Sequence, residues 1–226
     1  MMSRGDGAVV GQPGPAGSDE GGDWRRYGAL ELTPLLSAAL EAFYENGFHG
    51  TTVRDIARRH GQTVPSIYYH HQNKEGVFVA LLEKATSDLE WRVRTAADDG
   101  GDRPDRRLAY VVEAVVLHMT RRWKLAALEP EQRHLSDRVR KRYARRRRDI
   151  ERLVSDIVAD GVRCGVFTTP HPEETARAVL GMCQFVGRWF RPGGSLTPED
   201  VAARYADLAL ATAGSSCPAP SRPATS

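Results

Sequence analysis

The apolar residues of this chain recur three or four positions apart along most of its length. No stretch of four or more residues alternates convincingly between apolar and polar side chains, as a strand with one buried face would. Residues 33–47 are typical, because a Thr-Pro start is followed by the stripe Leu36, Leu40 and Phe43 and then by Asn-Gly. The pattern predicts an all-α fold. Later helices are expected to start near Thr52, Thr63, Asn73, Pro104, Ser136, Pro172 and Thr197.

The two ends of the chain depart from this pattern. Residues 1–23 hold seven glycines, two prolines and no aromatic residue, and residues 214–226 are rich in serine and proline. Such segments bury too little apolar surface to offset the entropy lost on ordering. We therefore expect a disordered arm at the N-terminus and a disordered tail at the C-terminus.

Composition excludes several classes of protein. The balance of 32 Lys and Arg against 29 Asp and Glu gives a net charge of +3, which is too small to indicate a partner. Cys164, Cys183 and Cys217 are odd in number and widely spaced, so we expect no disulfide framework and no metal site. No apolar run could span a bilayer and no signal peptide is recognisable, which predicts a cytoplasmic protein without a membrane partner. No histidine stands at motif spacing from a nucleophile or carboxylate, and no glycine-rich phosphate loop is present, so we expect neither an enzyme nor a cofactor.

Residues 52–74 carry the spacing of a helix-turn-helix. Ala57 is small enough to let two helices approach, and Gly61, four residues later, permits the left-handed turn between them. Ile67 would anchor the second helix, so that its opposite face projects outward, as a helix that enters a DNA major groove must. The spacing alone also occurs in tight helical hairpins that bind nothing, and both interpretations stay open at this point.

A longer series of motifs is more specific. Gly47-Phe48 is followed by Thr-Thr-Val-Arg-Asp-Ile-Ala at 51–57, by Pro-Ser-Ile-Tyr-Tyr-His at 65–70 and by Asn-Lys-Glu at 73–75. Over residues 33–84 the sequence resembles the TetR family of bacterial transcription regulators. The remaining six or so helices agree in number and order with the second domain of that family.

The resemblance implies two domains and three partners. Residues 24–75 would form the N-terminal helix-turn-helix DNA-binding domain, with three helices and the start of a long fourth, and residues 76–213 a C-terminal helical domain for ligand binding and dimerisation. The family usually represses genes and leaves a palindromic operator in double-stranded DNA when a small molecule binds. In the family the last two helices form the dimer interface, and small residues such as Gly181, Gly187 and Ala206 permit that contact here.

The resemblance also assigns a DNA-binding surface. The residues that it places against DNA are Thr52, Arg54, Thr63, Val64, Pro65, Ser66, Tyr68, Tyr69, His70 and Lys74. Hydroxyl groups suit phosphates or base edges, and the lysine would reach a phosphate at the start of the fourth helix. Gln62 and His71 depart from the family pattern, since an apolar residue and a phenylalanine are usual there. For Tyr69 and His71, packing beneath the motif is an equal alternative to DNA contact.

Residues 138–148 hold eight Lys and Arg side chains in eleven positions. We interpret this run first as a solvated helix face. Direct contact with the DNA backbone is an alternative, but the resemblance assigns this helix to the distal domain. The apolar stripe of the same helix leaves either Arg146 or Arg147 on its inward side.

An inward arginine at the mouth of an apolar pocket needs an anionic partner. Residues 187–210 also resemble the C-terminal part of TetR regulators associated with fatty-acid, sterol or other acyl-CoA catabolism. We therefore expect an effector that is an apolar acid or its CoA thioester. The candidate ligand-binding residues are Val115, Met119, Trp123, Tyr143, Arg146, Arg147 and Cys183. For Met119 and Trp123, as for His118, plain core packing is the alternative.

Two other functions remain compatible with the sequence. One is a helical ligand-binding protein that does not bind DNA. The other is a regulator that has lost operator recognition through its departures at Gln62 and His71 and acts through protein partners.

Overall fold

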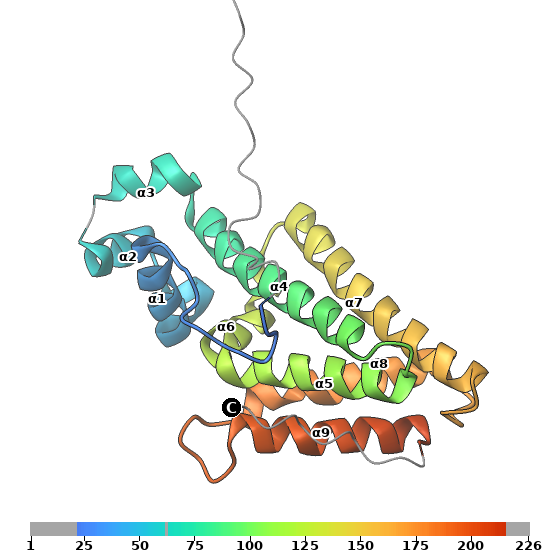
Figure 1. Cartoon of the computed structure of the whole chain (residues 1–226). Coiled ribbons are helices and arrows are strands. Elements are labelled where there is room, and N and C mark those ends of the chain that lie inside the picture. The colour runs from blue at the N-terminus through green and yellow to red at the C-terminus, as the bar shows by residue number, and fades with distance from the viewer. Residues whose placement is uncertain (1–21, 62, 216–226) are drawn as a thin grey trace, which may run out of the picture.

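The computed structural model describes residues 22–61 and 63–215, and these residues form nine α-helices, one short 3-10 helix and no strand (Figure 1). The predicted all-α fold class is thereby confirmed. Most of the predicted arm and tail, and Gln62, lie outside the described residues. Within the described part of the chain, no helix has the length and apolarity needed to cross a membrane.

Three helices and the start of a fourth form the N-terminal unit: α1 (Pro34–Gly50), α2 (Val53–His60), α3 (Val64–His71) and α4 (Lys74–Asp99). Local signals set their ends, as predicted. Thr33 accepts a hydrogen bond from the Leu36 amide at the start of α1, and the side chains and backbone amides of Thr52 and Asp55 form a reciprocal capping box on α2. Gly61 ends α2 with a φ of +72°, in the left-handed region that glycine adopts without strain.

Aromatic rings fill the centre of this unit. Phe43 lies 5.0 Å from Phe78 of α4 and 6.0 Å from Phe48, measured between ring centroids. Ile67 is buried beneath α3, as the helix-turn-helix spacing predicted. Segments that follow in sequence also enter this core, because α6 (Trp123–Leu128) and the first turns of α7 (Asp137–Arg163) contribute apolar side chains to it, as does Leu135 directly after the 3-10 helix η1 (Glu129–His134).

The second unit is built around α5 (Pro104–Arg121). Every side chain from Leu108 to Thr120 is buried, because α5 is enclosed by α4, α7, α8 (Pro172–Trp189) and α9 (Pro198–Ala213). In Figure 1, α9 runs along the base of the molecule, and α4 crosses on the other side of α5. A helix that is apolar on all sides is typical of such a central position.

Residues 24–27, the first part of the segment before α1, pack on this second unit. Trp24 is fully buried, its ring centroid lies 5.9 Å from that of Tyr110 on α5, and its Nε1 donates to Asp99 Oδ2 of α4 at 2.6 Å. The neighbouring Arg25 forms an ion pair with Glu113 of α5 at 3.0 Å. The sequence analysis predicted residue 24 to be the start of the DNA-binding domain. It could not reveal these contacts, because contacts between segments so far apart leave no local pattern in the sequence.

Candidate nucleic-acid interface and ligand cavity

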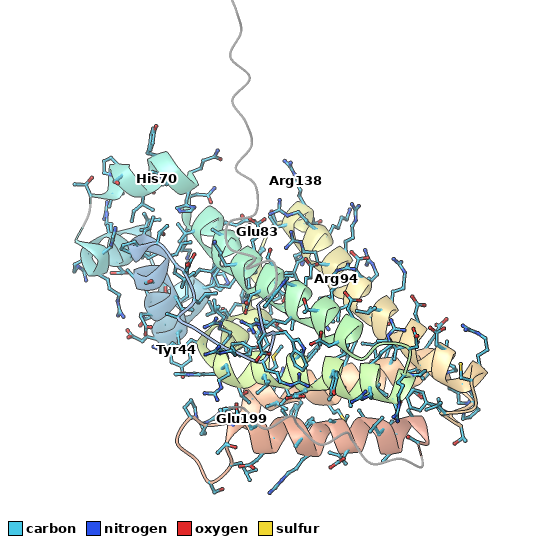
Figure 2. The ribbon with its side chains drawn as sticks, in the orientation of Figure 1. Tyr44, His70, Glu83, Arg94, Arg138 and Glu199 are labelled. Atoms are coloured by element: carbon cyan, nitrogen blue, oxygen red, sulfur yellow. The ribbon has the colours of Figure 1, made fainter. Side chains whose placement is uncertain are left out.

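The outer face of α3 carries aromatic and polar side chains. Burial of Ile67 fixes the helix against α2, and the opposite side presents Tyr68 and Tyr69 with 48% and 85% of their surface exposed. Figure 2 shows His70 at the outer edge of the molecule. Tyr69 therefore does not pack beneath the motif. His71 is half-buried, and burial together with the neighbouring His70 lowers its pKa.

The other predicted DNA-contacting residues lie at the amino ends of α2 and α3. Thr52 and Arg54 are exposed at the start of α2, and Thr63 and Pro65 are exposed at the start of α3. Val64 and Ser66 are half-buried there. The Thr52 hydroxyl is already engaged, since it donates to Asp55 Oδ2 at 2.6 Å and accepts from the Asp55 amide. Helix amino ends expose free backbone amides, which suits them to phosphate contact.

Lys74 has a structural role that the sequence did not reveal. Its Nζ donates to the backbone carbonyls of Phe48 at 2.7 Å and Thr51 at 2.9 Å, and it lies 4.5 Å from the centre of the Phe48 ring. These contacts tie the end of α1 to the start of α4, and burial lowers the pKa of the ammonium group. An ammonium group has three donors, so one remains for a phosphate. DNA contact by Lys74 stays a prediction.

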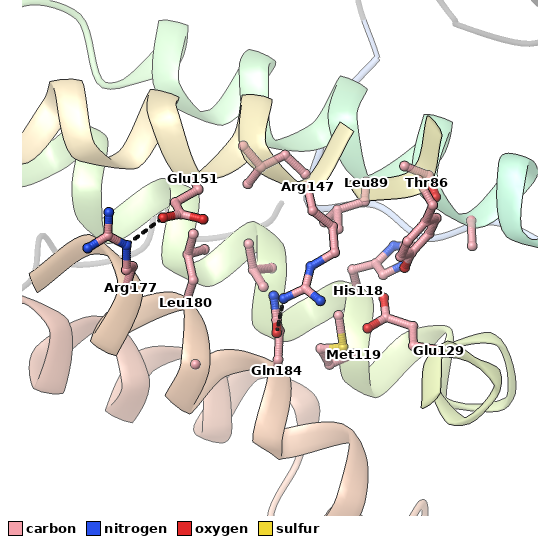
Figure 3. A pocket seen from close by; sticks show the side chains of 15 residues that line it. Thr86, Leu89, His118, Met119, Glu129, Arg147, Glu151, Arg177, Leu180 and Gln184 are labelled. Atoms are coloured by element: carbon pink, nitrogen blue, oxygen red, sulfur yellow. Dashed lines mark hydrogen bonds and ion pairs between the residues drawn. The ribbon is translucent and has the colours of Figure 1, made fainter. Parts of the chain in front are cut away.

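A cavity of about 180 Å³, partly open to solvent, lies between α4, α5, α7 and α8 (Figure 3). Four of the predicted ligand residues line it, namely Val115, Met119, Tyr143 and Arg147. The walls also include Leu89 of α4 and Leu180 of α8, so the interior is largely apolar.

Three of the predicted ligand residues do not line this cavity. Trp123 packs edge-on against Tyr44 of α1, with ring centroids 5.0 Å apart. Cys183 is buried in the core on the inner side of α8, and this burial raises the pKa of its thiol to about 12. Arg146 turns to α4, where it donates to Ser87 and lies 3.9 Å from Glu90. Of the two arginines left open by the apolar stripe, Arg147 is therefore the one at the cavity.

Arg147 stands at the mouth of the cavity, and its hydrogen-bond partner there is neutral. Its Nη2 donates to Gln184 Oε1 of α8 at 2.9 Å. Figure 3 shows the side chain reaching from α7 across the opening, with Glu129 on the far side. A neutral amide does not cancel the charge of a guanidinium group, so Arg147 is free to bind an anion as well.

Polar groups line the inner end of the cavity. Glu129 of η1 and Tyr143 of α7 interact there, and burial raises the pKa of both side chains. Thr86 and Gln184 also line the site. The sequence analysis missed Glu129 because it precedes Pro130 in a segment without helical periodicity. The only available signal was that break in the pattern.

A buried ionic cluster lies behind the cavity wall. His118 lines the cavity on α5, and its Nδ1 lies 3.4 Å from Asp88 Oδ2 on α4. Arg92 donates from Nε to the other oxygen of Asp88 at 3.1 Å, and Arg122 Nε lies 3.5 Å from Oδ2. Burial disfavours the Asp88 carboxylate, but His118 and Arg92 outweigh it, so the pKa of Asp88 lies well below its usual range. This cluster joins the cavity wall to the helix that leads into the N-terminal unit.

Both units match known families and proteins. Residues 35–81 match the family described as bacterial regulatory proteins, tetR family, and residues 101–213 match the tetracyclin repressor-like C-terminal domain. The HTH-type transcriptional repressor KstR2 of Rhodococcus jostii (strain RHA1) is 30% identical over 200 residues, which cover 88% of this chain and 95% of that protein.

Solved structures agree with these matches. The ketosteroid transcriptional regulator KstR2 of Mycobacterium tuberculosis has a TM-score of 0.71 at 27% identity, covering 78% of this chain and 91% of that chain. The structure of AibR in complex with isovaleryl coenzyme A and operator DNA has a TM-score of 0.70 at 24% identity, covering 77% of this chain and 95% of that chain. At that identity the likeness to AibR shows the fold alone.

Proposed function

Because this chain belongs to the TetR family of bacterial regulatory proteins and is a DNA-binding transcription regulator rather than an enzyme, we propose that it represses genes from a palindromic operator and that a small molecule releases it. The observation that carries the proposal is the exposure of Tyr68, Tyr69 and His70 on α3, opposite the buried Ile67. A short helix held on one side and exposed on the other is suited to the major groove. Relatives named as repressors support the sign of regulation.

The residues on this surface suit both kinds of DNA contact. The hydroxyls of Ser66 and Tyr68 would bind phosphates or base edges, and Val64 and Pro65 would contact a thymine methyl group. Arg54, at the amino end of α2, would bind a phosphate. These roles depend on short-range fit more than on charge, because α3 carries no Lys or Arg.

Exposed apolar side chains on α8 and α9 support a homodimer. Phe185 of α8 and Leu208 of α9 have 57% and 51% of their surface exposed. Trp189, four positions after Phe185 on α8, is also exposed. Large apolar residues are seldom left in water in this number on neighbouring helices unless a partner covers them. A second copy paired through these helices would present two α3 helices, which is the requirement for a palindromic operator.

The cavity supports an apolar effector with an anionic group. Its walls are largely apolar, and Arg147 at the mouth offers a charge whose hydrogen-bond partner is the neutral amide of Gln184. Burial raises the pKa of the Glu129 carboxyl and so disfavours its charged form, while Arg147 acts in the opposite direction. An apolar acid or its CoA thioester fits this arrangement. That a relative is described as a ketosteroid regulator agrees with an apolar ligand.

The cavity is also connected to the DNA-binding unit through α4. Thr86 and Leu89, which line it, belong to α4, and His118 on the opposite wall pairs with Asp88 of the same helix. A ligand that separates α4 from α5 would therefore shift the helix whose first turn carries Lys74. Differential affinity for the two positions of α4 is what release of the operator requires.

The DNA-binding proposal is tested by titrating the protein into a fluorescent duplex from the region upstream of its own gene, with excess unrelated DNA at about physiological salt. We expect saturable binding in the nanomolar range and at least a tenfold loss with Tyr68→Ala. Tyr44→Ala is the matched control, since Tyr44 is similarly exposed at 42% but lies on α1 against Trp123. Equal effects of the two substitutions, or binding that unrelated DNA abolishes, would contradict the proposal.

The dimer is tested by light scattering at micromolar concentration. We expect twice the chain mass for the wild type and the monomer mass for Phe185→Glu. Tyr69→Glu, which places the same charge at a still more exposed ring outside the α8 and α9 face, should stay dimeric. Monomer mass for the wild type would exclude the dimer.

The effector class is tested by calorimetry with a panel of acyl-CoAs, free acids and uncharged hydrophobes. We expect binding by an acyl-CoA or an acid, and a loss of at least tenfold with Arg147→Gln. Arg146→Gln is the control, because Arg146 is the neighbour of Arg147 on α7 but faces Ser87 and Glu90 instead of the cavity. Binding of an uncharged hydrophobe alone would contradict the anionic class.

A further inference from the structure

The basic run of α7 divides into two sets of side chains. Four of its eight cations have partners among the described residues: Arg140 pairs with Asp137, Arg142 with Glu83, Arg146 with Glu90, and Arg147 donates to Gln184. The other four are Arg138, Lys141, Arg145 and Arg148, which are exposed and make no ion pair with the described residues. We call these four residues the cation stripe.

The spacing of the cation stripe places it on one face of α7. Its members are three, four and three positions apart, which is the spacing of side chains on one side of an α-helix. Ten residues of helix extend about 15 Å. Tyr143 and Val139 pack on a different side of the helix, against the core. The stripe is therefore a continuous positive surface turned away from the protein.

The start of α7 lies beside the DNA-binding unit. The Ser136 amide donates to Glu75 Oε1 at 2.9 Å, which ties the beginning of α7 to the first turn of α4. Leu135 and Tyr143 are buried in the same core as Phe43 and Ile67. The sequence assigned α7 to the distal domain, which spoke against DNA contact by this run. These contacts place the first turns of α7, through Tyr143, beside the DNA-binding unit.

The stripe begins at the same edge of the molecule as the recognition surface. In Figure 2, Arg138 at the start of α7 and His70 on α3 both project from the upper edge, with the first turns of α4 between them. DNA that lies along the outer face of α3 would pass this edge.

The DNA-binding unit has little positive charge of its own. Residues 24–84 hold 7 Lys and Arg against 6 Asp and Glu, a difference of +1. On α2, Arg58 pairs with Asp55 and Arg59 with Glu45. Affinity for DNA at physiological salt depends strongly on neutralisation of phosphates by cations. Cations from elsewhere in the chain would therefore add to its affinity for DNA.

We propose that the cation stripe of α7 binds the phosphate backbone of the operator, beside the base pairs that α3 contacts. Arginine and lysine on an exposed helix face are opposite in charge to phosphates, and contacts to phosphates do not distinguish one base sequence from another. The stripe thus supplies affinity, and α3 supplies sequence preference. This inference rests on the proposed function, since it requires that the protein bind operator DNA.

The test is the salt dependence of operator binding by the full-length protein. The test variant carries Arg138→Gln, Lys141→Gln and Arg145→Gln, and the control carries Arg94→Gln, Arg106→Gln and Arg163→Gln, three exposed positions outside the stripe. Both variants lose three positive charges. Circular dichroism and thermal unfolding establish that each is folded.

We expect the slope of log K against log salt to fall by about 2 to 3 in the test variant, close to 0.9 for each lost phosphate contact, and to stay near the wild-type slope in the control. Affinity for the operator and for a scrambled duplex should fall by the same factor. Equal slopes in the two variants, or a loss that affects only acyl-CoA binding, would overturn the inference and leave the proposed function intact. A wild-type protein that binds no duplex would overturn both.

Discussion

A local cap in the N-terminal unit and a long-range contact in the unit that holds the cavity stabilise the protein in different ways. In the first, the side chains and backbone amides of Thr52 and Asp55, three positions apart, close the start of α2. In the second, side chains join segments that are far apart, as Trp24 and Asp99 are joined across 75 positions. A change to a local cap should therefore loosen one helix end, whereas a change to a long-range contact should loosen several elements.

The largest expected effect is that of Trp24→Ala. This change removes a buried ring from the second unit together with its hydrogen bond to Asp99, and we expect it to lower the free energy of unfolding by about 4 kcal/mol. Urea denaturation measures the difference. Trp24→Phe keeps the ring and loses only the hydrogen bond, so it should cost less. A loss below 1 kcal/mol for Trp24→Ala would show that the segment before α1 is not part of that core.

A smaller effect is expected for Asp88→Asn, which removes the carboxylate between Arg92 and His118. Breaking a buried ion pair typically costs about 3 kcal/mol. Because these partners hold the pKa of Asp88 below its usual range, its stabilisation is present above about pH 4 and is lost as the pH falls through the folded-state pKa. Unfolding measured from pH 7 to pH 3 should therefore show a steeper loss of stability in the wild type than in the variant. Parallel curves would contradict the role of the cluster.

Gly61→Ala tests a local signal in the N-terminal unit. A Cβ atom at Gly61 would meet nothing within 4 Å, so the cost arises only from its φ of +72°, about 1 kcal/mol. Gly50→Ala is the matched control, because Gly50 has no positive φ and its Cβ would be 3.4 Å from the Asn46 side chain. Thermal unfolding should separate the two. Equal costs would show that the turn conformation is not what Gly61 provides.

The smallest effect is expected for Thr52→Ala. Loss of the hydroxyl that accepts from the Asp55 amide should cost about 1 kcal/mol or less, measured without DNA. Thr52→Ser keeps the hydroxyl and should restore most of the stability. If Thr52→Ser were as unstable as Thr52→Ala, the cap would not explain the loss.

The same difference decides what could be predicted from the sequence. Thr33, Thr52 and Gly61 act within one turn of their own helix, and each was found at the predicted helix end. The periodicity of α5 was also readable from spacing, and spacing limited the inward arginine of α7 to Arg146 or Arg147, between which only the structure decides. Local patterns thus predict the fold class and the outward face of α3.

The cavity could be predicted only in part, because its walls come from four helices and a 3-10 segment. Spacing along a helix tells which residues face inward but not which inward residues meet. Val115 and Arg147 therefore line the cavity, whereas Cys183, equally inward, packs in the core. Glu129 was missed because no periodic pattern surrounds it.

The central claim is that the cavity controls the DNA-binding unit. The measurement is the dissociation constant for the operator duplex, with and without a saturating amount of the acyl-CoA that binds most tightly in calorimetry, for the wild type and for Arg147→Gln. We expect the acyl-CoA to raise the operator Kd of the wild type at least tenfold, and to raise it much less in the variant at the same concentration. An acyl-CoA that binds through Arg147 and leaves the operator Kd of the wild type unchanged would contradict the account.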